Sequence, residues 1–162
     1  MARLTHLDAR GHPRMVDVGA KRVTERTAVA EARLTLPRAV ALELRRARHV
    51  TGKGPVFDTA IIAGVMGAKR THELIPFCHP LGLENCTVEI VDGRADELLI
   101  RCTASVRHKT GVEMEALTGA AIAALTVYDM CKALSHDIEI TSVRLIAKSG
   151  GRRAFKRKEA RT

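Results

Sequence analysis

The chain has 162 residues and a mass of 17.7 kDa, and 46% of its residues are apolar and 28% charged. This length can bury a core without disulfide or metal staples, and the composition excludes a wholly disordered chain. No apolar run approaches the ~20 residues that a membrane span needs, and no apolar stretch follows the basic residues near the N-terminus. The four cysteines form no CxxC pair, which is typical of reduced thiols in a cytoplasm. We therefore expect one soluble, cytoplasmic domain over residues 1–162.

The net charge of +9 is concentrated near the C-terminus, where residues 148–162 carry seven basic side chains and one acidic side chain. We expect residues 152–162 to form a flexible basic tail. Such a tail could bind nucleic acid or polyphosphate. However, the chain has one tyrosine, three phenylalanines and no tryptophan, which are too few rings to stack bases and also fill a core. Nucleic acid is therefore not the expected partner.

The first half of the chain predicts one strand and two helices. Residues 27–36 alternate between polar side chains and small apolar ones, which predicts a half-buried strand. Pro37 suits the first turn of a helix that runs to about residue 48. The TGKGP sequence at 51–55 predicts a turn-rich break. A second helix is expected over 56–71, loosened by Gly64 and Gly67, and the prolines of the following LIPFCHPLG segment exclude regular helix there.

The second half predicts a hairpin, a long helix and a final strand. Two strands are expected over 84–91 and 98–106, and the last over 138–147. The helix is expected over 112–134, introduced by a capping box between Thr110 and Glu113. Strands that flank helices, with a hairpin between them, predict an α+β fold in which helices cover one face of an antiparallel sheet.

Three loop residues are candidates for chemistry. Lys53 stands between two glycines, which would let the backbone approach a phosphate, although the Walker spacing is absent and a solvated lysine is the simpler interpretation. Cys78 and His79 are held between two prolines. Because adjacent residues of an extended chain point to opposite faces, they do not predict a catalytic dyad, and no second ligand pair supports zinc. A small buried hydrophobe is the simpler interpretation of Cys78, whereas His79 stays open.

The long helix carries charged residues near both ends. Glu113 and Glu115 complement the helix dipole at its start, and Met114 between them has the spacing of a core residue. Asp129 interrupts the apolar LTVYDMCKAL segment, where packing disfavours a charge, and Lys132 follows three residues later on the same face. A surface ion pair is the simpler interpretation of this pair, and a functional carboxylate is the alternative.

Helix geometry separates two of these candidates. Glu115 and Asp129 lie 14 residues apart, which places them about 21 Å apart along one helix. No small substrate can contact both ends within one chain. If both carboxylates serve one reaction, the site must be shared between chains. Lys148, in the glycine-rich and basic AKSGGR segment, is a further candidate for phosphate binding.

These segments together resemble a known family. The MVDVGAK sequence at 15–21, IAGVMGAKRTHELIPFCHPL at 62–81, KTGVEMEALTGAAIAALTVYDMCKAL at 109–134 and RLIAKSGG at 144–151 are similar to the cyclic pyranopterin monophosphate synthases. The family comprises lyases of molybdenum cofactor biosynthesis, and the resemblance covers nearly the whole chain. It implies a ferredoxin-like fold, a homohexamer built as a trimer of dimers with sites at subunit interfaces, and neither a cofactor nor a metal.

The resemblance also implies a reaction and a set of site residues. The substrate would be 3′,8-cyclo-7,8-dihydro-GTP, converted to cyclic pyranopterin monophosphate with release of pyrophosphate. Asp129 would be the principal acid or base, assisted by Lys132 and Lys53. The substrate-binding residues implied in the same way are Phe77, Cys78, His79, Glu113, Met114, Glu115 and Lys148.

The chain departs from the family pattern at a few positions. Phe77 replaces an expected leucine, Asp58 and Ile61 replace an alanine and an arginine, and Pro55 replaces a common aspartate. These changes leave one fewer candidate phosphate contact and do not affect Asp129. Two alternatives to the lyase remain: an inactive paralogue that keeps the hexamer as a scaffold, and a nucleic-acid-binding α+β module that uses the basic tail.

Overall fold

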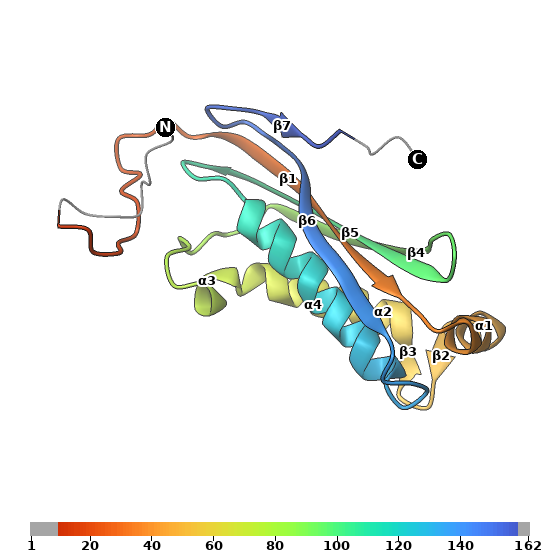
Figure 1. The fold of residues 1–162 in the computed structure, drawn as a ribbon. Helices are drawn as coiled ribbons and strands as arrows, with labels where there is room; N and C mark the ends of the chain where they lie inside the picture. The colour runs from red at the N-terminus through yellow and green to blue at the C-terminus, as the bar shows by residue number, and fades with distance from the viewer. Residues whose placement is uncertain (1–9, 159–162) are drawn as a thin grey trace.

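The computed structural model describes residues 10–158, in which the alternating and helical patterns of the sequence form strands and four helices (Figure 1). A five-stranded antiparallel sheet has the strand order β4-β5-β1-β6-β7, and β2 and β3 form a separate hairpin. The strands are β1 (Thr24–Thr35), β2 (Val50–Thr51), β3 (Gly54–Pro55), β4 (Asn85–Asp92), β5 (Glu97–His108), β6 (Glu139–Ser149) and β7 (Phe155–Lys156). The helices are α1 (Arg38–Arg46), α2 (Val56–Lys69), α3 (Thr71–Leu74) and α4 (Glu113–Cys131).

The order of the main elements identifies the architecture. The path β1, α2, β4, β5, α4, β6 is the βαββαβ order of ferredoxin-like folds, with β1 central between β5 and β6. Helices α2 and α4 lie side by side on one face of the sheet (Figure 1). The predicted α+β, ferredoxin-like fold is therefore confirmed. None of the helices in residues 10–158 is long and apolar enough to cross a membrane.

Small residues let the helices approach the sheet and each other closely. The apolar positions of β1, predicted from alternation, all face the helices and are buried: Ala28, Ala30, Ala32 and Leu34. A Cβ at Gly64 of α2 would lie 2.8 Å from the carbonyl oxygen of Gly119 in α4. The expectation that Gly64 and Gly67 loosen the second helix was therefore wrong, because these glycines allow α2 to pack tightly against α4.

The ends of several elements differ from the sequence-based expectations. The predicted capping box is wrong: the N-cap of α4 is Val112, and no side chain caps the helix. The carboxylate of Glu113 instead binds Lys148 on β6, so it is not available to cap the backbone. Helix α4 ends at Cys131, three residues before the predicted end. Part of the predicted tail forms β7 against β6, and its residues 159–162 lie outside the described part of the chain.

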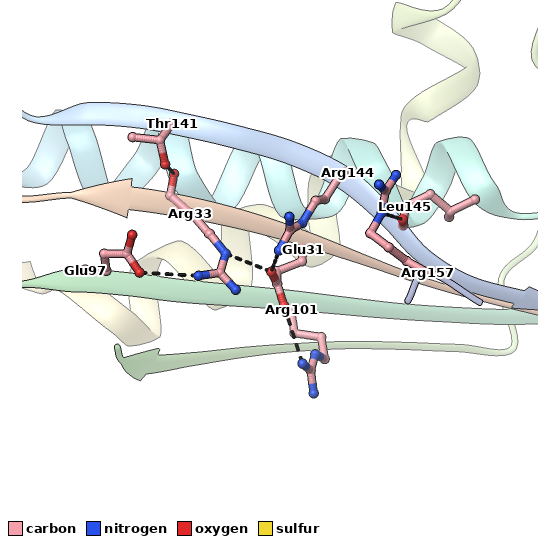
Figure 2. Close-up of polar contacts among 8 residues, drawn as sticks. All are labelled: Glu31, Arg33, Glu97, Arg101, Thr141, Arg144, Leu145 and Arg157. Atoms are coloured by element: carbon pink, nitrogen blue, oxygen red, sulfur yellow. Dashed lines mark hydrogen bonds and ion pairs between the residues drawn. The ribbon is translucent and has the colours of Figure 1, made fainter. Parts of the chain in front are cut away.

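A buried carboxylate lies on the sheet face opposite the helices (Figure 2). Glu31 is only 4% exposed because arginines from three strands surround it. Arg144 of β6 donates to it at 2.9 Å, Arg33 of β1 at 3.0 Å and Arg101 of β5 at 3.4 Å. Burial alone would raise the pKa of Glu31, but the hydrogen bonds from Arg144 and Arg33 lower it overall. This cluster ties the three central strands together.

We expect Glu31→Gln to lower the free energy of unfolding by about 2 kcal/mol at neutral pH, since it removes the carboxylate that three guanidinium groups share and leaves Glu97, which pairs with Arg33, as the remaining counter-charge. The arginines are partly exposed, which limits the effect. Because the pKa of Glu31 is lower in the folded chain than its ordinary value of 4.5, ionised Glu31 stabilises the fold at pH values above 4.5. This contribution is lost as the pH falls through the folded-state pKa. Urea unfolding should therefore show the two proteins converging in acid. Glu97→Gln, which removes only the contact with Arg33, is the control; an equal loss there would contradict the role of Glu31.

Candidate active site

Three predicted residues meet at the C-terminal end of α4. The ammonium group of Lys53, from the β2–β3 hairpin, lies 2.7 Å from Oδ2 of Asp129 and 2.8 Å from its carbonyl oxygen. Lys132 lies 2.7 Å from Oδ1 of the same carboxylate. The glycines on either side of Lys53 form the tight hairpin that projects this side chain toward the helix. We call Lys53, Asp129 and Lys132 the lysine–aspartate cluster.

The lysine–aspartate cluster is exposed rather than buried. The side chain of Asp129 is 54% exposed, because the apolar neighbours Val127, Met130 and Cys131 face the core instead. The interpretation of Asp129 as a charge within packed surroundings was therefore wrong, whereas the ion pair with Lys132 is confirmed. The hydrogen bonds from Lys132 and then Lys53 lower the pKa of Asp129 to about 2. The same contact with Asp129 raises the pKa of Lys132.

A second group of predicted residues lies at the N-terminal end of α4. Lys148 of β6 donates to Oε1 of Glu113 at 2.6 Å. Glu115, two residues later, is only 4% exposed, and its own backbone provides a hydrogen bond to its carboxyl group. Burial, followed by the charge of Glu113, raises the pKa of Glu115 to about 7, although a backbone hydrogen bond opposes the shift. A carboxyl group with this pKa can both donate and accept a proton near neutral pH.

The loop after α3 brings further predicted residues to this end of the helix. Burial and then the charge of Glu115 raise the pKa of Cys78, so this thiol is a neutral, half-buried group. The ring Nε2 of His79 lies 3.0 Å from the carbonyl oxygen of Val16, in the segment before β1. Phe77 is 40% and Met114 is 37% exposed. The expectation that Met114 is a core residue was therefore wrong: it is an exposed apolar side chain between Glu113 and Glu115.

A basic cleft opens beside Glu113 and Lys148. It has a volume of about 1030 Å³ and lies between the segment before β1, the start of α4 and the turn after β6. Gly150 in that turn has φ +83°, and a Cβ there would collide with the carbonyl oxygen of Glu25, so the turn can lie against β1 only as glycine. Among residues 10–158, Glu113 is the one acidic side chain that lines the cleft. The basic residues that line it are Lys21, Arg22, Arg26, Lys109, Lys148, Arg152 and Arg153.

Sequence reasoning missed most of the cleft. It singled out Lys148 but not Arg26 or Lys109, whose contacts build the wall. Arg26 donates to the carbonyl oxygens of His108 and Lys109 at 3.3 and 3.4 Å, and Lys109 donates to the carbonyl oxygen of Gly19 at 2.6 Å. The sequence did contain a clue to these cleft residues, because basic residues such as Lys21 and Lys109 lie within the segments that resemble the family.

The described chain therefore brings the candidates together as two groups rather than one. The lysine–aspartate cluster and the Glu113–Glu115 group occupy opposite ends of α4, about 21 Å apart at the helical rise. Among residues 10–158, no group of three or more His, Cys, Asp or Glu side chains is arranged to hold a metal ion. One end has two ammonium groups on the Asp129 carboxylate, and the other has the carboxyl group of Glu115, with its raised pKa, close to the basic cleft.

Comparison with known proteins identifies the family to which the sequence belongs. The sequence matches the MoaC family over residues 15–151. It is 58% identical over 153 residues to a cyclic pyranopterin monophosphate synthase from Xanthomonas oryzae pv. oryzae, covering 94% of this chain and 92% of that protein. It is 52% identical over 151 residues to the protein of that name from Chloroflexus aurantiacus, covering 92% and 91%. It is also 52% identical over 160 residues to molybdenum cofactor biosynthesis protein 1 of Drosophila melanogaster, covering 98% of this chain and 28% of that protein. The chain belongs to the MoaC family.

Proposed function

We propose that this protein is a cyclic pyranopterin monophosphate synthase, a lyase that converts 3′,8-cyclo-7,8-dihydro-GTP to cyclic pyranopterin monophosphate and pyrophosphate. Relatives with this name share more than half of their residues with the chain across nearly their whole length. The observation that carries the proposal is the pairing of Lys53 and Lys132 with Asp129. An inactive scaffold would have no reason to keep two ammonium groups on one exposed carboxylate, since exposed ion pairs add little stability.

The two groups on α4 suit the two demands of this reaction. Closing a cyclic phosphate expels pyrophosphate, so cations must hold the triphosphate and neutralise the charge that develops. The basic cleft beside Lys148 supplies these cations. Opening a purine ring and building a pterin requires several proton transfers. Glu115, with a pKa of about 7, and the lysine–aspartate cluster supply the groups for these transfers. His79, Cys78, Phe77 and Met114 line the side where the pterin ring forms.

The low pKa of Asp129 defines its part in this proposal. With a pKa of about 2, Asp129 is a carboxylate at neutral pH and cannot be the acid. It orients the ammonium groups of Lys53 and Lys132, which are the proton donors at this end of the site. It becomes a base only when substrate separates it from one of the lysines.

The site is completed across a subunit interface in a homohexamer, a trimer of dimers. The support is the length of α4: the lysine–aspartate cluster and Glu115 lie too far apart to contact one small substrate within a chain. Opposite ends of α4 helices from neighbouring chains would then meet around each substrate. The free thiols of all four cysteines support placing the reaction in a reducing compartment such as the cytoplasm.

Mixed oligomers test the shared site. Asp129→Asn and Glu115→Gln chains are each expected to be inactive alone. If each site takes one group from each of two chains, random assembly of the two variants at equal amounts restores about a quarter of the wild-type activity, because that fraction of sites has both native groups. The variants would carry different affinity tags and be co-expressed, and doubly tagged oligomers would be assayed. Absence of any restored activity in doubly tagged oligomers would place the whole site within one chain.

Release of pyrophosphate from 3′,8-cyclo-7,8-dihydro-GTP, with detection of the pterin product, tests the reaction itself. We expect stoichiometric pyrophosphate and product. A folded oligomer that releases no pyrophosphate would overturn the proposal in favour of the scaffold paralogue. Binding to nucleic acid with a steep salt dependence that disappears when residues 152–162 are deleted would favour the nucleic-acid-binding module.

A further inference from the structure

Two cysteines that have no part in the proposed reaction lie next to each other under the helices. The sulfur atoms of Cys86 on β4 and Cys102 on β5 are 3.9 Å apart. The other two cysteines are separate from this pair: Cys78 lies in the loop after α3, and Cys131 is at the end of α4. Cys86 and Cys102 are thus the only cysteines in residues 10–158 with a recorded sulfur–sulfur contact.

The strand register places both side chains on the same face of the sheet. Cys86 pairs with Ala104, and Cys102 pairs with Val88, so the cysteines are diagonal neighbours across an antiparallel hairpin. In each strand, every second residue faces the helices and is largely buried, and both cysteines occupy such positions. Diagonal pairs are within reach of side-chain contact, although they are farther apart than directly opposed pairs.

The two thiols differ in exposure and acidity. Cys86 is half-buried near the start of β4, whereas Cys102 is fully buried. The hydrogen-bond contact with the Cys102 thiol, together with the nearby charge of Lys69, lowers the pKa of Cys86 despite its partial burial. The same contact and burial raise the pKa of Cys102. Cys86 is therefore the thiol that ionises first, and thiolates are the form that reacts with oxidants.

We propose that Cys86 and Cys102 form an oxidisable pair, in which Cys86 reacts with a peroxide and Cys102 resolves the product to a disulfide within the chain. The Cys86 thiolate attacks one peroxide oxygen, the O–O bond breaks, and a water leaves after protonation, which gives a sulfenic acid. Cys102 then attacks the Cys86 sulfur, its proton goes to the departing hydroxide, and a second water leaves. Two thiols and one hydrogen peroxide thus give one disulfide and two waters.

Formation of the disulfide requires the two sulfur atoms to move closer together. The sulfur atoms must approach from 3.9 Å to about 2.05 Å. Cys86 is the second residue of β4, so the strand can adjust at its end. The Cys102 sulfur also contacts α4, since a Cβ at Gly119 would lie 2.6 Å from it. The inference does not depend on the proposed reaction.

The experiment uses the reduced, full-length protein treated with hydrogen peroxide, then unfolded and alkylated. We expect two of the four cysteines to resist alkylation, with a mass loss equal to two hydrogen atoms. Trypsin leaves Cys78 and Cys86 on one peptide, because no Lys or Arg separates them. A second digestion after Glu84 and Glu89 should release residues 85–89 joined to residues 102–107.

Single variants distinguish a disulfide from general oxidation. Cys86→Ser should keep Cys102 alkylatable after peroxide treatment. Cys102→Ala should stop at a sulfenic acid on Cys86, which a 1,3-dione traps. Cys131→Ala removes a different buried thiol and should form the disulfide as the wild type does. The proposal is overturned if the wild type keeps Cys102 alkylatable after Cys86 has been oxidised, or if the disulfide joins Cys78, Cys131 or two chains.

Discussion

We expect Asp129→Asn to lower pyrophosphate release by about 10²–10⁴-fold, the range for loss of a positioned proton-transfer group, because the proton donors Lys53 and Lys132 lose the carboxylate that orients them. Asparagine has nearly the same shape but cannot hold two ammonium groups through charge. Lys53 and Lys132, which lie 2.7 Å from the carboxylate oxygens, would lose the contact that orients them. Because the Asp129 side chain is 54% exposed, the variant should fold normally and keep the melting temperature of the wild type.

Asp137→Asn is the matched control, because Asp137 is also an exposed aspartate near this end of α4, and the side-chain hydrogen bond that it makes is a local one with Ser135. Both variants lose one negative charge, so a general electrostatic effect on substrate binding would appear in both. Activity in Asp129→Asn within a few-fold of the wild type would remove Asp129 from the chemistry. Loss of activity together with a lowered melting temperature would indicate a structural role instead.

We expect Glu115→Gln to lose activity and gain stability in the same protein. The buried carboxyl group of Glu115 titrates near neutral pH, and glutamine keeps its shape but cannot transfer a proton. Activity should fall by about 10²–10⁴-fold. If Glu115 must change its protonation state during turnover, the wild type should show an inflection near pH 7 in its activity profile, and the residual activity of the variant should lack it.

The stability gain follows from the direction of the pKa shift. The pKa of Glu115 rises from 4.5 to about 7 on folding, so the unfolded chain releases this proton at lower pH than the folded chain. The wild type therefore loses stability as the pH rises from 4.5 to about 7. The full difference corresponds to about 3 kcal/mol. Glutamine does not ionise and avoids this loss.

Urea unfolding at several pH values measures this effect. Glu115→Gln and the wild type should have similar stability near pH 4.5, and the variant should be more stable at pH 8. Glu89→Gln, at an exposed position on β4, is the control and should show no such pH-dependent gain. A Glu115→Gln protein that is no more stable than the wild type at pH 8 would mean that Glu115 is not a buried, protonated group below neutral pH.

The fold was predictable because its signals are local. The alternation in β1 and the long helical pattern of α4 come from neighbouring residues, and both elements formed close to the expected bounds. The burial of Glu31 was not predictable in this way. Its alternation position suggested an exposed residue, but Arg101 and Arg144 come from strands 70 and 113 residues away in the chain. Only the sheet register brings them together.

The candidate site was predictable in part for the same reason. Asp129 and Lys132 lie on one helical turn, so their contact follows from spacing alone. The contact of Lys53 with Asp129 spans 76 residues, and the sequence suggested it only through resemblance to a family. Glu113 was wrongly expected to cap α4, because a local pattern could not show that Lys148 approaches from β6. The elevated pKa of Glu115 depends on burial, which the dipole argument did not address.

Helix α4 fixes both the distance and the rotation about its axis between the Glu115 end and the Asp129 end. One inserted or deleted residue between Glu115 and Asp129 would turn one end relative to the other by about 100° and shift it by about 1.5 Å. Such a change would also move Gly119 out of contact with α2 and β5. A point substitution on the exposed side of the helix carries no such penalty. A change of chain length within the 19 residues of α4 is therefore expected to be harmful, because this helix sets the spacing between the two groups of the proposed site.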